Sequence, residues 1–306
     1  MVIFSSFWYN GDKEKTIGQG GVTVENVILG AFADEAGGSL AEQIAALREN
    51  GMVNLEARNI KGRNFVDLAP AEARKVKERL DEAGLRVWSI GSPIGKIGAD
   101  EPFAPHLDRL RRALELGRIM GSERMRVFSF YIPAGESHAA CRDEVGERLE
   151  RMLEAADGSG IRLCHENEKG IYGDTAAHCA ALLEALPKLA AVFDPANFIQ
   201  CGEDTLTTWE RLHGRVDYFH VKDCLADGRV VPCGAGVGHV PELIRAFCAA
   251  GGRQLTLEPH LAVFDGFGAL ERAGEQSRID DAVYPSKRAA FDAAADALRR
   301  CLETMS

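Results

Sequence analysis

The sequence lacks the features of membrane and nucleic-acid-binding proteins. No run of residues reaches the roughly 18 apolar side chains that a membrane-spanning helix needs, so we expect no membrane partner. The 306 residues carry 36 Lys and Arg against 46 Asp and Glu, a formal net charge of −10, and the basic residues form no cluster. Because phosphate backbones are bound by concentrated Lys and Arg, we also expect no nucleic-acid partner.

The sequence also has no Cys-x-x-Cys pair and nothing typical of a signal peptide. Its eight cysteines are scattered, and several lie inside apolar runs, which is typical of reduced thiols in a cytosolic protein. Residues 2–9 are apolar, but they lack a basic flank and a small-residue cleavage site, and charged residues follow at 12–15. We therefore expect a cytoplasmic protein.

Strand-like and helix-like segments alternate along the chain. The strand-like runs are residues 27–32, 53–58, 86–90, 125–130, 161–166, 189–194, 216–220 and 255–258. The helix-like segments are residues 39–50, 70–82, 106–120, 144–156, 175–186, 206–212, 241–250 and 286–304. This pattern predicts an α/β fold, a (β/α)8 TIM barrel that forms a single domain over residues 28–306. The competing doubly wound sheet would usually carry Gly-x-Gly-x-x-Gly after the first strand, where this chain has ADEAGG at residues 33–38.

Four side chains of the kinds that bind metals stand at the ends of short apolar runs: Glu166, Asp194, His220 and Glu258. Their spacing is close to the roughly 30 residues of one βα unit. Consecutive parallel strands would therefore bring them to the same edge of the barrel, where TIM barrels carry out their chemistry. Three carboxylates and one imidazole suit one divalent metal ion, which we expect to be Mn²⁺, Mg²⁺ or Co²⁺, with Zn²⁺ also acceptable to the imidazole.

Five motifs make the sequence similar to a known family. They are HENEKG at residues 165–170, FDPANF at 193–198, HVKD at 220–223, PCGAGVG at 232–238 and LEPH at 257–260. In this order the motifs resemble the xylose-isomerase-like TIM-barrel superfamily, and in particular its sugar phosphate isomerase/epimerase family. The resemblance covers residues 28–304. It implies the barrel and a single divalent metal held by Glu166, Asp194, His220 and Glu258.

The resemblance also implies a reaction. In the ketose 3-epimerases of this superfamily, the first and last glutamates are metal ligands and also the proton-transfer pair, which here are Glu166 and Glu258. We therefore expect a sugar isomerase or epimerase that moves a proton α to a carbonyl through a metal-stabilised enediolate, with a carbohydrate or polyol as substrate. A lyase or dehydratase that eliminates a group β to the carbonyl starts with the same step and stays open as the alternative. A binding barrel without catalysis would be expected to lack one of the two glutamates.

One residue departs from the family pattern. Asn197 stands where those epimerases, and the trinuclear-zinc endonuclease of the superfamily, carry a histidine. The endonuclease also has histidines after its third and fourth strands, where this chain has none. A three-zinc cluster would therefore lack several ligands, which disfavours a nuclease. The missing histidine also weakens a strict assignment as a ketose 3-epimerase.

Further side chains are predicted to line the pocket. Strand alternation and loop position suggest six substrate-binding residues: Arg58, Lys96, Glu168, Asn197, Lys222 and His260. For Arg58, a salt bridge at the barrel rim is an equal alternative, and Glu56 is the other candidate to point inward from the same strand. His165 should point away from the pocket. Asp223 is expected to brace its loop or to orient His220.

Three segments outside the regular βα pattern have separate interpretations. The loop 234–238, GAGVG, is either a phosphate-binding loop or a tight turn near the pocket. The long loops 223–239 and 260–285 exceed the usual two to six residues and are predicted to cover the substrate, with Phe264 and Phe267 sealing the pocket. Residues 1–27 are predicted to be an N-terminal extension, either mobile or packed on a neighbouring subunit of a homo-oligomer.

Overall fold

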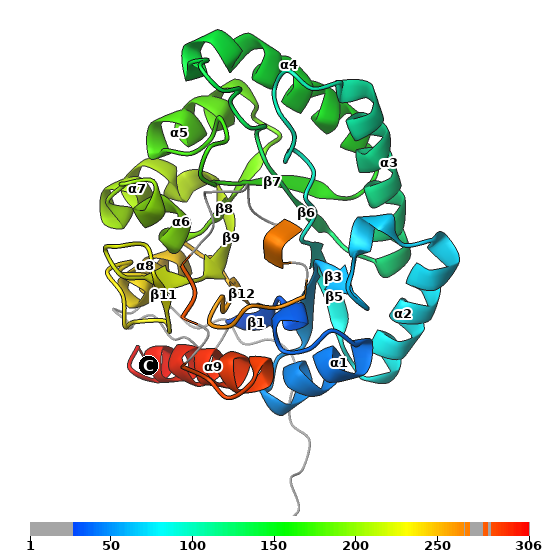
Figure 1. Ribbon diagram of the computed structural model, residues 1–306, viewed down its shortest axis with the longest axis vertical. Coiled ribbons are helices and arrows are strands. Elements are labelled where there is room, and N and C mark those ends of the chain that lie inside the picture. Colours follow the sequence, from blue (N-terminus) through cyan, green and yellow to red (C-terminus); the bar gives the residue numbers. More distant parts are fainter. Residues whose placement is uncertain (1–26, 266, 270–277, 281–282, 306) are drawn as a thin grey trace, which may run out of the picture.

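The computed structural model describes residues 27–265, 267–269, 278–280 and 283–305. The predicted N-terminal extension therefore lies outside the described residues except for Val27, and so does part of the loop 260–285. The described strands close into a parallel barrel with the neighbour order β1-β12-β9-β8-β7-β6-β5-β2. Helices surround this barrel on its outer side (Figure 1). The predicted (β/α)8 barrel is confirmed.

The barrel strands and the helices follow the predicted order. The barrel strands are β1 (Ile28–Ala31), β2 (Asn54–Ala57), β5 (Arg86–Ile90), β6 (Arg124–Val127), β7 (Arg162–Glu166), β8 (Ala190–Phe193), β9 (Val216–Val221) and β12 (Gln254–Leu257). The α-helices are α1 (Leu40–Glu49), α2 (Pro70–Glu82), α3 (Phe103–Met120), α4 (His138–Ala156), α5 (Ala176–Ala185), α6 (Pro195–Gln200), α7 (Thr205–Leu212), α8 (Val240–Ala249) and α9 (Lys287–Glu303). Two short antiparallel ribbons add β3 (Asn59–Ile60) with β4 (Arg63–Asn64), and β10 (Asp223–Cys224) with β11 (Val230–Val231).

Capping residues explain where the helices begin. Ser39 and Glu42 form the predicted capping box of α1, in which the Ser39 hydroxyl accepts from the Glu42 amide at 3.2 Å. Helix α4 begins six residues before its predicted start because the Ser137 side chain caps it there. Helix α6 was not predicted at all. It is a helix of six residues. The Asp194 carboxylate caps its start by accepting a hydrogen bond from the Asn197 amide at 3.0 Å.

Side chains alternate along the strands, so that a polar layer lies on an apolar layer inside the barrel. In β9, Tyr218 and His220 point into the barrel, whereas Phe219 points outward and packs against Phe247 of α8. Buried Cys164, Ala190, Val192 and Tyr218 form a small apolar cluster with the half-buried Trp88, as expected for a barrel interior filled by side chains. The residues two positions further along β7, β8 and β9 are Glu166, Asp194 and His220. The strand order thus builds a polar layer on top of a packed interior.

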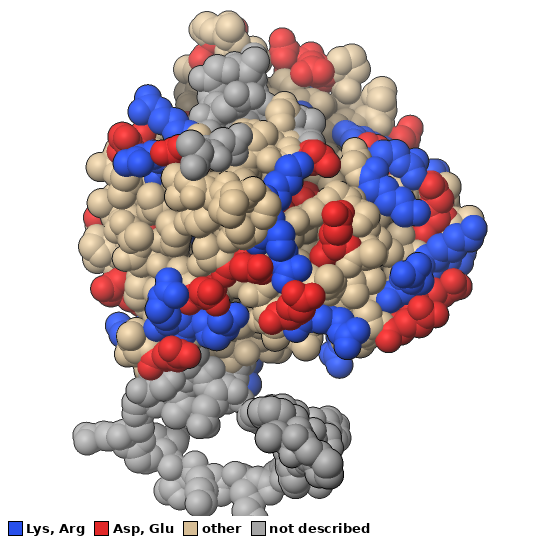
Figure 2. All heavy atoms as spheres, turned by 60° about the horizontal axis from the view of Figure 1, so that its bottom comes forward, with Lys and Arg blue, Asp and Glu red and all other residues tan. Residues whose placement is uncertain are grey.

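The surface shows no extended basic area in the view of Figure 2. Basic and acidic side chains are interspersed over this face. Within the described ranges, no helix combines the length and the apolar character that crossing a membrane requires.

Candidate active site

Four buried side chains converge at one edge of the barrel. Glu166 ends β7, Asp194 follows β8, His220 lies in β9 and Glu258 follows β12. Each of them offers one ligand atom such that all four atoms lie within 4.8 Å of one another. The predicted four-residue set is therefore brought together by the fold.

The donor atoms of this cluster suit a cation. The Nδ1 atom of His220 lies 2.6 Å from Oε1 of Glu166 and 3.2 Å from Oε2 of Glu258. Asp194 Oδ2 and Glu258 Oε2 are buried and accept no hydrogen bond of regular geometry, although the Lys222 ammonium lies 2.8 and 3.5 Å from them. Buried carboxylate oxygens that share one small space need a positive charge between them. Three carboxylates and an imidazole form a ligand set that fits Mg²⁺, Mn²⁺, Co²⁺ or Zn²⁺.

The charges of the cluster are only partly balanced by the protein. Burial by itself would raise the pKa of Glu166, but His220 and Arg126 outweigh it and lower that pKa to about 2. For Glu258, too, burial is opposed, here by Lys222 and the neighbouring histidines, which hold its pKa well below the usual range. Burial raises the pKa of Asp194 to about 7 in spite of Lys222. Two carboxylates are thus firmly ionised, and the third has an incompletely compensated charge, as a cation site requires.

Glu56 fixes the orientation of the His220 imidazole from the side opposite the other carboxylates. The Nε2 atom of His220 lies 3.1 Å from Oε2 of Glu56, which is fully buried in β2. This contact leaves Nδ1 as the nitrogen that faces the three carboxylates. Histidine ligands of metals usually donate their second N–H to such a carboxylate. Glu56 therefore points into the barrel, and Arg58, two residues further on, lines the cavity.

Two buried arginines hold the two glutamates in place. Arg126 in β6 lies 3.1 Å from Oε2 of Glu166, and Arg58 lies 3.2 Å from Oε1 of Glu258. Both guanidinium groups lie over the ring of Phe32, at 5.0 and 4.3 Å from its centroid. Arg126 was missed in the sequence, although an arginine inside the apolar run 125–130 was a usable signal. Each glutamate therefore has its own cationic neighbour.

Arg58 makes ion pairs in addition to lining the pocket. Its guanidinium pairs with Asp34 and Glu35, each at 2.9 Å, as well as with Glu258. The salt-bridge alternative for Arg58 is therefore confirmed in a buried position. Its role in substrate binding stays a prediction.

A small cavity lies directly above the four-residue cluster. Its volume is about 10 Å³, and its lining comprises Arg58, Lys96, Arg126, Phe128, Glu166, Glu168, Asn197, Lys222, Glu258 and His260. All six predicted substrate-binding residues are in this lining. Lys96 pairs with Glu168 at 3.2 Å, and the Asn197 side chain donates to the Asn167 carbonyl at 2.8 Å. A tight, polar and charged space above a candidate metal cluster is suited to a small polar substrate.

An aromatic cover lies beside this cavity. Phe264, Phe267 and His260 pack edge to face with ring centroids 5.4–5.6 Å apart, and the Arg58 guanidinium lies 4.5 Å from the Phe264 ring. The short 3-10 helix η5 (Phe267–Ala269) is the orange turn near the centre of the barrel in Figure 1. The two phenylalanines are therefore placed where the sequence predicted a seal.

The glycine-rich loop is a tight turn around Asp223. The amides of Gly234, Gly236 and Gly238 donate to the Asp223 carboxylate at 2.9, 3.1 and 3.0 Å. A Cβ atom at Gly236 would lie 2.3 Å from Asp223 Oδ1, so the turn requires glycine there. These amides are already used by a carboxylate, which favours the tight turn over a phosphate loop. Asp223 braces the loop, as one of the two expectations had it.

His165 points away from the site, as predicted. Its Nε2 atom lies 2.9 Å from the Ser129 hydroxyl, which also accepts from the Gly173 amide at 2.7 Å. Burial lowers the pKa of His165 to about 4, so the ring is neutral near pH 7. It is a structural residue of the layer outside the barrel.

Two further groups of side chains have the composition of metal ligands. Glu35 and His260 extend the cluster through Glu258, and the His260 amide donates to Glu35 at 2.6 Å.

The other group comprises His138, Asp174 and His178 at the rim. Its two imidazoles are stacked at 4.0 Å with only 10° between their planes. Because the lone pairs of parallel rings do not converge, this second group is a poor ligand set.

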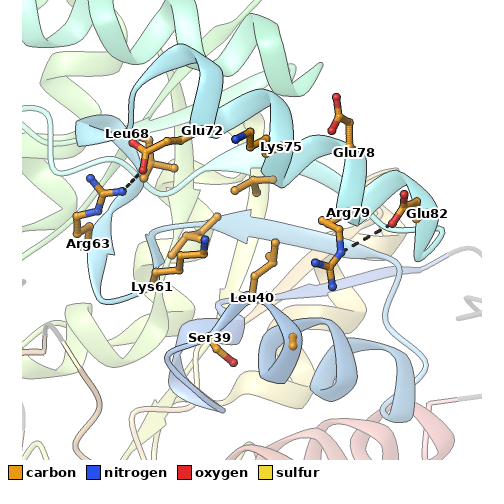
Figure 3. A pocket seen from close by; sticks show the side chains of 13 residues that line it. Ser39, Leu40, Lys61, Arg63, Leu68, Glu72, Lys75, Glu78, Arg79 and Glu82 are labelled. Carbon is orange, nitrogen blue, oxygen red and sulfur yellow. Dashed lines mark hydrogen bonds and ion pairs between the residues drawn. The ribbon is translucent and has the colours of Figure 1, made fainter.

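A larger cavity is remote from this chemistry. It has a volume of about 690 Å³ and lies between α1 and α2 on the outside of the barrel (Figure 3). Figure 3 shows two ion pairs at this cavity, Arg63 with Glu72 at 2.5 Å and Arg79 with Glu82 at 3.8 Å. The side chains of these pairs are exposed and do not converge on one point. The small cavity at the strand ends is therefore the better candidate for catalysis.

Comparisons with known proteins agree with this architecture. A comparison with curated protein sequences gives no significant match. Solved structures with this fold include an L-ribulose 3-epimerase, 17% identical with a TM-score of 0.67 over 91% of this chain and 95% of its own. They also include the IOLI protein with a binding zinc atom, 10% identical with a TM-score of 0.69 over 92% of this chain and 99% of its own. A third is the probable 3-DHS dehydratase AsbF from Bacillus anthracis, 16% identical with a TM-score of 0.66 over 90% of this chain and 98% of its own.

The sequence itself supplies the assignment. A family model described as xylose isomerase-like TIM barrel matches residues 44–262, which is more than half of the chain and includes all four residues of the cluster. The resemblance inferred from the five motifs is thereby confirmed. The chain belongs to the xylose isomerase-like TIM barrel family.

Proposed function

We propose that this protein is a divalent-metal-dependent isomerase or epimerase that moves a proton at the carbon next to the carbonyl of a small keto-sugar or keto-polyol. The observation that carries the proposal is the pair of buried, ionised carboxylates of Glu166 and Glu258 at one small cavity. Membership of the family and the epimerases among the solved structures support the same class of reaction.

The two glutamates approach the cavity from different sides. Strands β8 and β9 separate β7 from β12 in the barrel, so Glu166 and Glu258 are not on neighbouring strands. Their low pKa values keep both carboxylates unprotonated near pH 7, which is the state that a general base needs before it removes a proton. Arg126 and Arg58 fix their orientations. One carboxylate removes the proton from one face of the substrate, and the other returns a proton to the opposite face.

The ligand set for the metal is Glu166, Asp194, Glu258 and the Nδ1 atom of His220. When bound there, a divalent cation supplies Lewis-acid stabilisation of the negative charge that develops on substrate oxygen. Lys222, whose ammonium lies 2.8 Å from Asp194, donates hydrogen bonds at the floor of the cavity. Lys96 and Glu168, held together at 3.2 Å, offer a donor and an acceptor to substrate hydroxyls.

The cover excludes water from the reacting carbon. Phe264 and Phe267 are only 3% and 8% exposed, and they contact His260 in the lining of the cavity. Exclusion of water protects a carbanion-like species from side reactions and strengthens electrostatic contacts. A substrate must open this cover to enter, because the cavity is smaller than a sugar.

A lyase or dehydratase is the second candidate. It would use the same proton abstraction and then expel a hydroxyl or a sugar from the next carbon. The specific observation in its favour is the Lys222 ammonium in the lining of the cavity, which can protonate a leaving oxygen. The shared fold of the probable dehydratase AsbF is in keeping with this alternative.

Solvent isotope exchange tests the proposal. The Mn²⁺-loaded protein would be incubated in D2O with a panel of ketopentoses, ketohexoses and 3-keto-glucosides, followed by proton NMR. We expect one member to gain deuterium next to its carbonyl and to yield an isomer or epimer. The surface variant Glu147→Gln should behave like the wild type, because that side chain is exposed on α4. Formation of an unsaturated product would select the lyase, and turnover without deuterium would contradict proton abstraction and point to hydride transfer.

A further inference from the structure

Two cysteines from distant parts of the sequence meet at the edge of the barrel. Cys233 lies in the loop between β11 and α8, and Cys301 lies in the last turns of α9. Their sulfur atoms are 3.4 Å apart, and the Cys301 sulfur also lies 3.5 Å from the Cys233 carbonyl oxygen. Figure 1 shows the C-terminal part of α9 next to β11 and α8. A disulfide bond is about 2.05 Å long, so a small shift of the side chains would bring these atoms into bonding distance.

The two thiols are partly exposed, and that of Cys301 has a lowered pKa. Both residues are half-buried, whereas Cys141, Cys164 and Cys179 are buried in the core. The hydrogen bond from the Cys233 thiol lowers the pKa of Cys301 to about 7. A thiolate is the nucleophile in thiol–disulfide exchange, so Cys301 is the attacking residue and Cys233 the resolving residue.

We propose that Cys233 and Cys301 are a modification site, a thiol pair that forms a reversible intramolecular disulfide with an oxidised low-molecular-weight thiol, RSSR. The Cys301 thiolate attacks one sulfur of RSSR, which releases RS⁻ and leaves a mixed disulfide on Cys301. The Cys233 thiolate then attacks the Cys301 sulfur and releases the second RS⁻. The two protein thiols give up two protons to the two RS⁻ ions, so two cysteines and RSSR become one disulfide and two RSH. This proposal is independent of the proposed function.

The disulfide would tie the glycine-rich loop to the last helix. The Gly234 amide, next to Cys233, donates to the Asp223 carboxylate at 2.9 Å, and Asp223 follows Lys222 of the cavity lining. Cross-linking residues so far apart in sequence removes much freedom from the unfolded chain. We therefore expect the oxidised protein to have a higher Tm than the reduced protein and the loop to be held more firmly.

Peptide mapping tests this directly on the full chain. The reduced protein would be treated with oxidised glutathione, alkylated, and digested with trypsin without reduction. Trypsin releases Cys233 within residues 230–245, and it cleaves after Arg300 to give a separate peptide that begins at Cys301. We expect these two peptides to appear joined, the thiol count to fall by two and Tm to rise by several degrees, all reversed by dithiothreitol.

Variants separate the pair from other thiols. Cys233→Ser and Cys301→Ser should each abolish the joined peptide and the rise in Tm. The matched control Cys248→Ser, at a half-buried cysteine of α8, should keep both. Wild-type protein that carries only glutathione adducts, or that joins a different pair of cysteines, would overturn the proposal.

Discussion

The imidazole of His220 and the carboxylate of Glu56 lie 3.1 Å apart, Nε2 to Oε2, at a fully buried position in the barrel. Glu56 is itself held through Oε1 by the Tyr218 hydroxyl at 2.8 Å and the Ser89 hydroxyl at 3.2 Å. The chain of contacts fixes the imidazole so that Nδ1 faces Glu166, Asp194 and Glu258. The geometry of the candidate metal cluster therefore depends on a carboxylate outside it.

Glu56→Gln should weaken metal binding without removing a ligand. The amide keeps the size of the side chain but loses the negative charge that orients the imidazole and raises its basicity. Loss of such a partner typically lowers metal affinity by about 10- to 100-fold. Titration calorimetry with Mn²⁺ on the metal-stripped protein would measure the change, with Glu147→Gln as the surface control. An unchanged affinity would contradict a role for Glu56 in orienting the imidazole toward the metal.

Metal content should depend on His220 and on pH. Burial opposes a charge on the His220 imidazole, but Glu166 and Glu56 outweigh it and raise the pKa of His220 well above its usual range. A coordinating nitrogen must be free of its proton, so metal binding has to release one and the affinity should rise with pH. Elemental analysis should find one equivalent of metal in the wild type and far less in His220→Ala. Equal metal content in the two proteins would remove His220 from the site.

Truncation of the aromatic cover should harm catalysis more than folding. Phe264 and Phe267 belong to a small cluster with Ile279 that is separate from the main core. We expect the double variant Phe264→Ala/Phe267→Ala to lose kcat/KM by about tenfold or more, a cost of about 1.4 kcal/mol per factor of ten. Phe247→Ala is the matched control, because Phe247 is buried in the main core and its loss should cost about 3–5 kcal/mol of stability. Full activity of the double variant on the true substrate would make the loop a surface element.

Acid should destabilise the protein partly through His106. Burial lowers the pKa of His106 to about 4, and the neutral ring accepts a hydrogen bond from the Gly95 amide at 2.7 Å. The pKa in the folded state is below the ordinary value of 6.5, so this stability is present above pH 6.5 and is lost as the pH falls toward 4. This difference between the pKa of His106 in the folded and the unfolded protein corresponds to roughly 3 kcal/mol of unfolding free energy.

His106→Gln measures this contribution. The glutamine carbonyl can still accept from the Gly95 amide, but it does not titrate. Urea unfolding at pH 7 and at pH 4.5 should show a smaller loss of unfolding free energy in the variant than in the wild type. Equal losses in the two proteins would contradict the assignment of a neutral, buried His106.

Much of the fold could be predicted because local chemistry agrees with the tertiary structure. Buried parallel strands appear as apolar runs, and α1 and α2 begin at a capping box and at a proline, so their limits follow from neighbouring residues. Helix α6 does not follow from the sequence pattern because it is too short to show a period and depends on Asp194, whose place at a strand end indicates a ligand. One carboxylate serves both purposes, since Oδ1 caps the helix and Oδ2 faces the cluster.

The residues of the site could be predicted where their positions follow from the ends of the strands. The four cluster residues and the six pocket residues follow from spacing, alternation and the motifs. Pairings across the barrel do not follow from local patterns, because they depend on strand order and side-chain direction. Thus Arg126 opposite Glu166, Glu56 behind His220, and the meeting of Cys233 with Cys301 became visible only in three dimensions.

The most direct test of the account is isotope exchange by Glu166→Gln and Glu258→Gln with each of two epimeric substrates. If each glutamate serves one face of the substrate, each variant should lose interconversion. Each should still exchange the proton of one epimer with solvent deuterium, and the two variants should act on opposite epimers. Elemental analysis must show that both variants retain metal, because the glutamates are also its proposed ligands. Loss of exchange with the same epimer in both metal-loaded variants, or interconversion in either, would contradict a two-carboxylate mechanism.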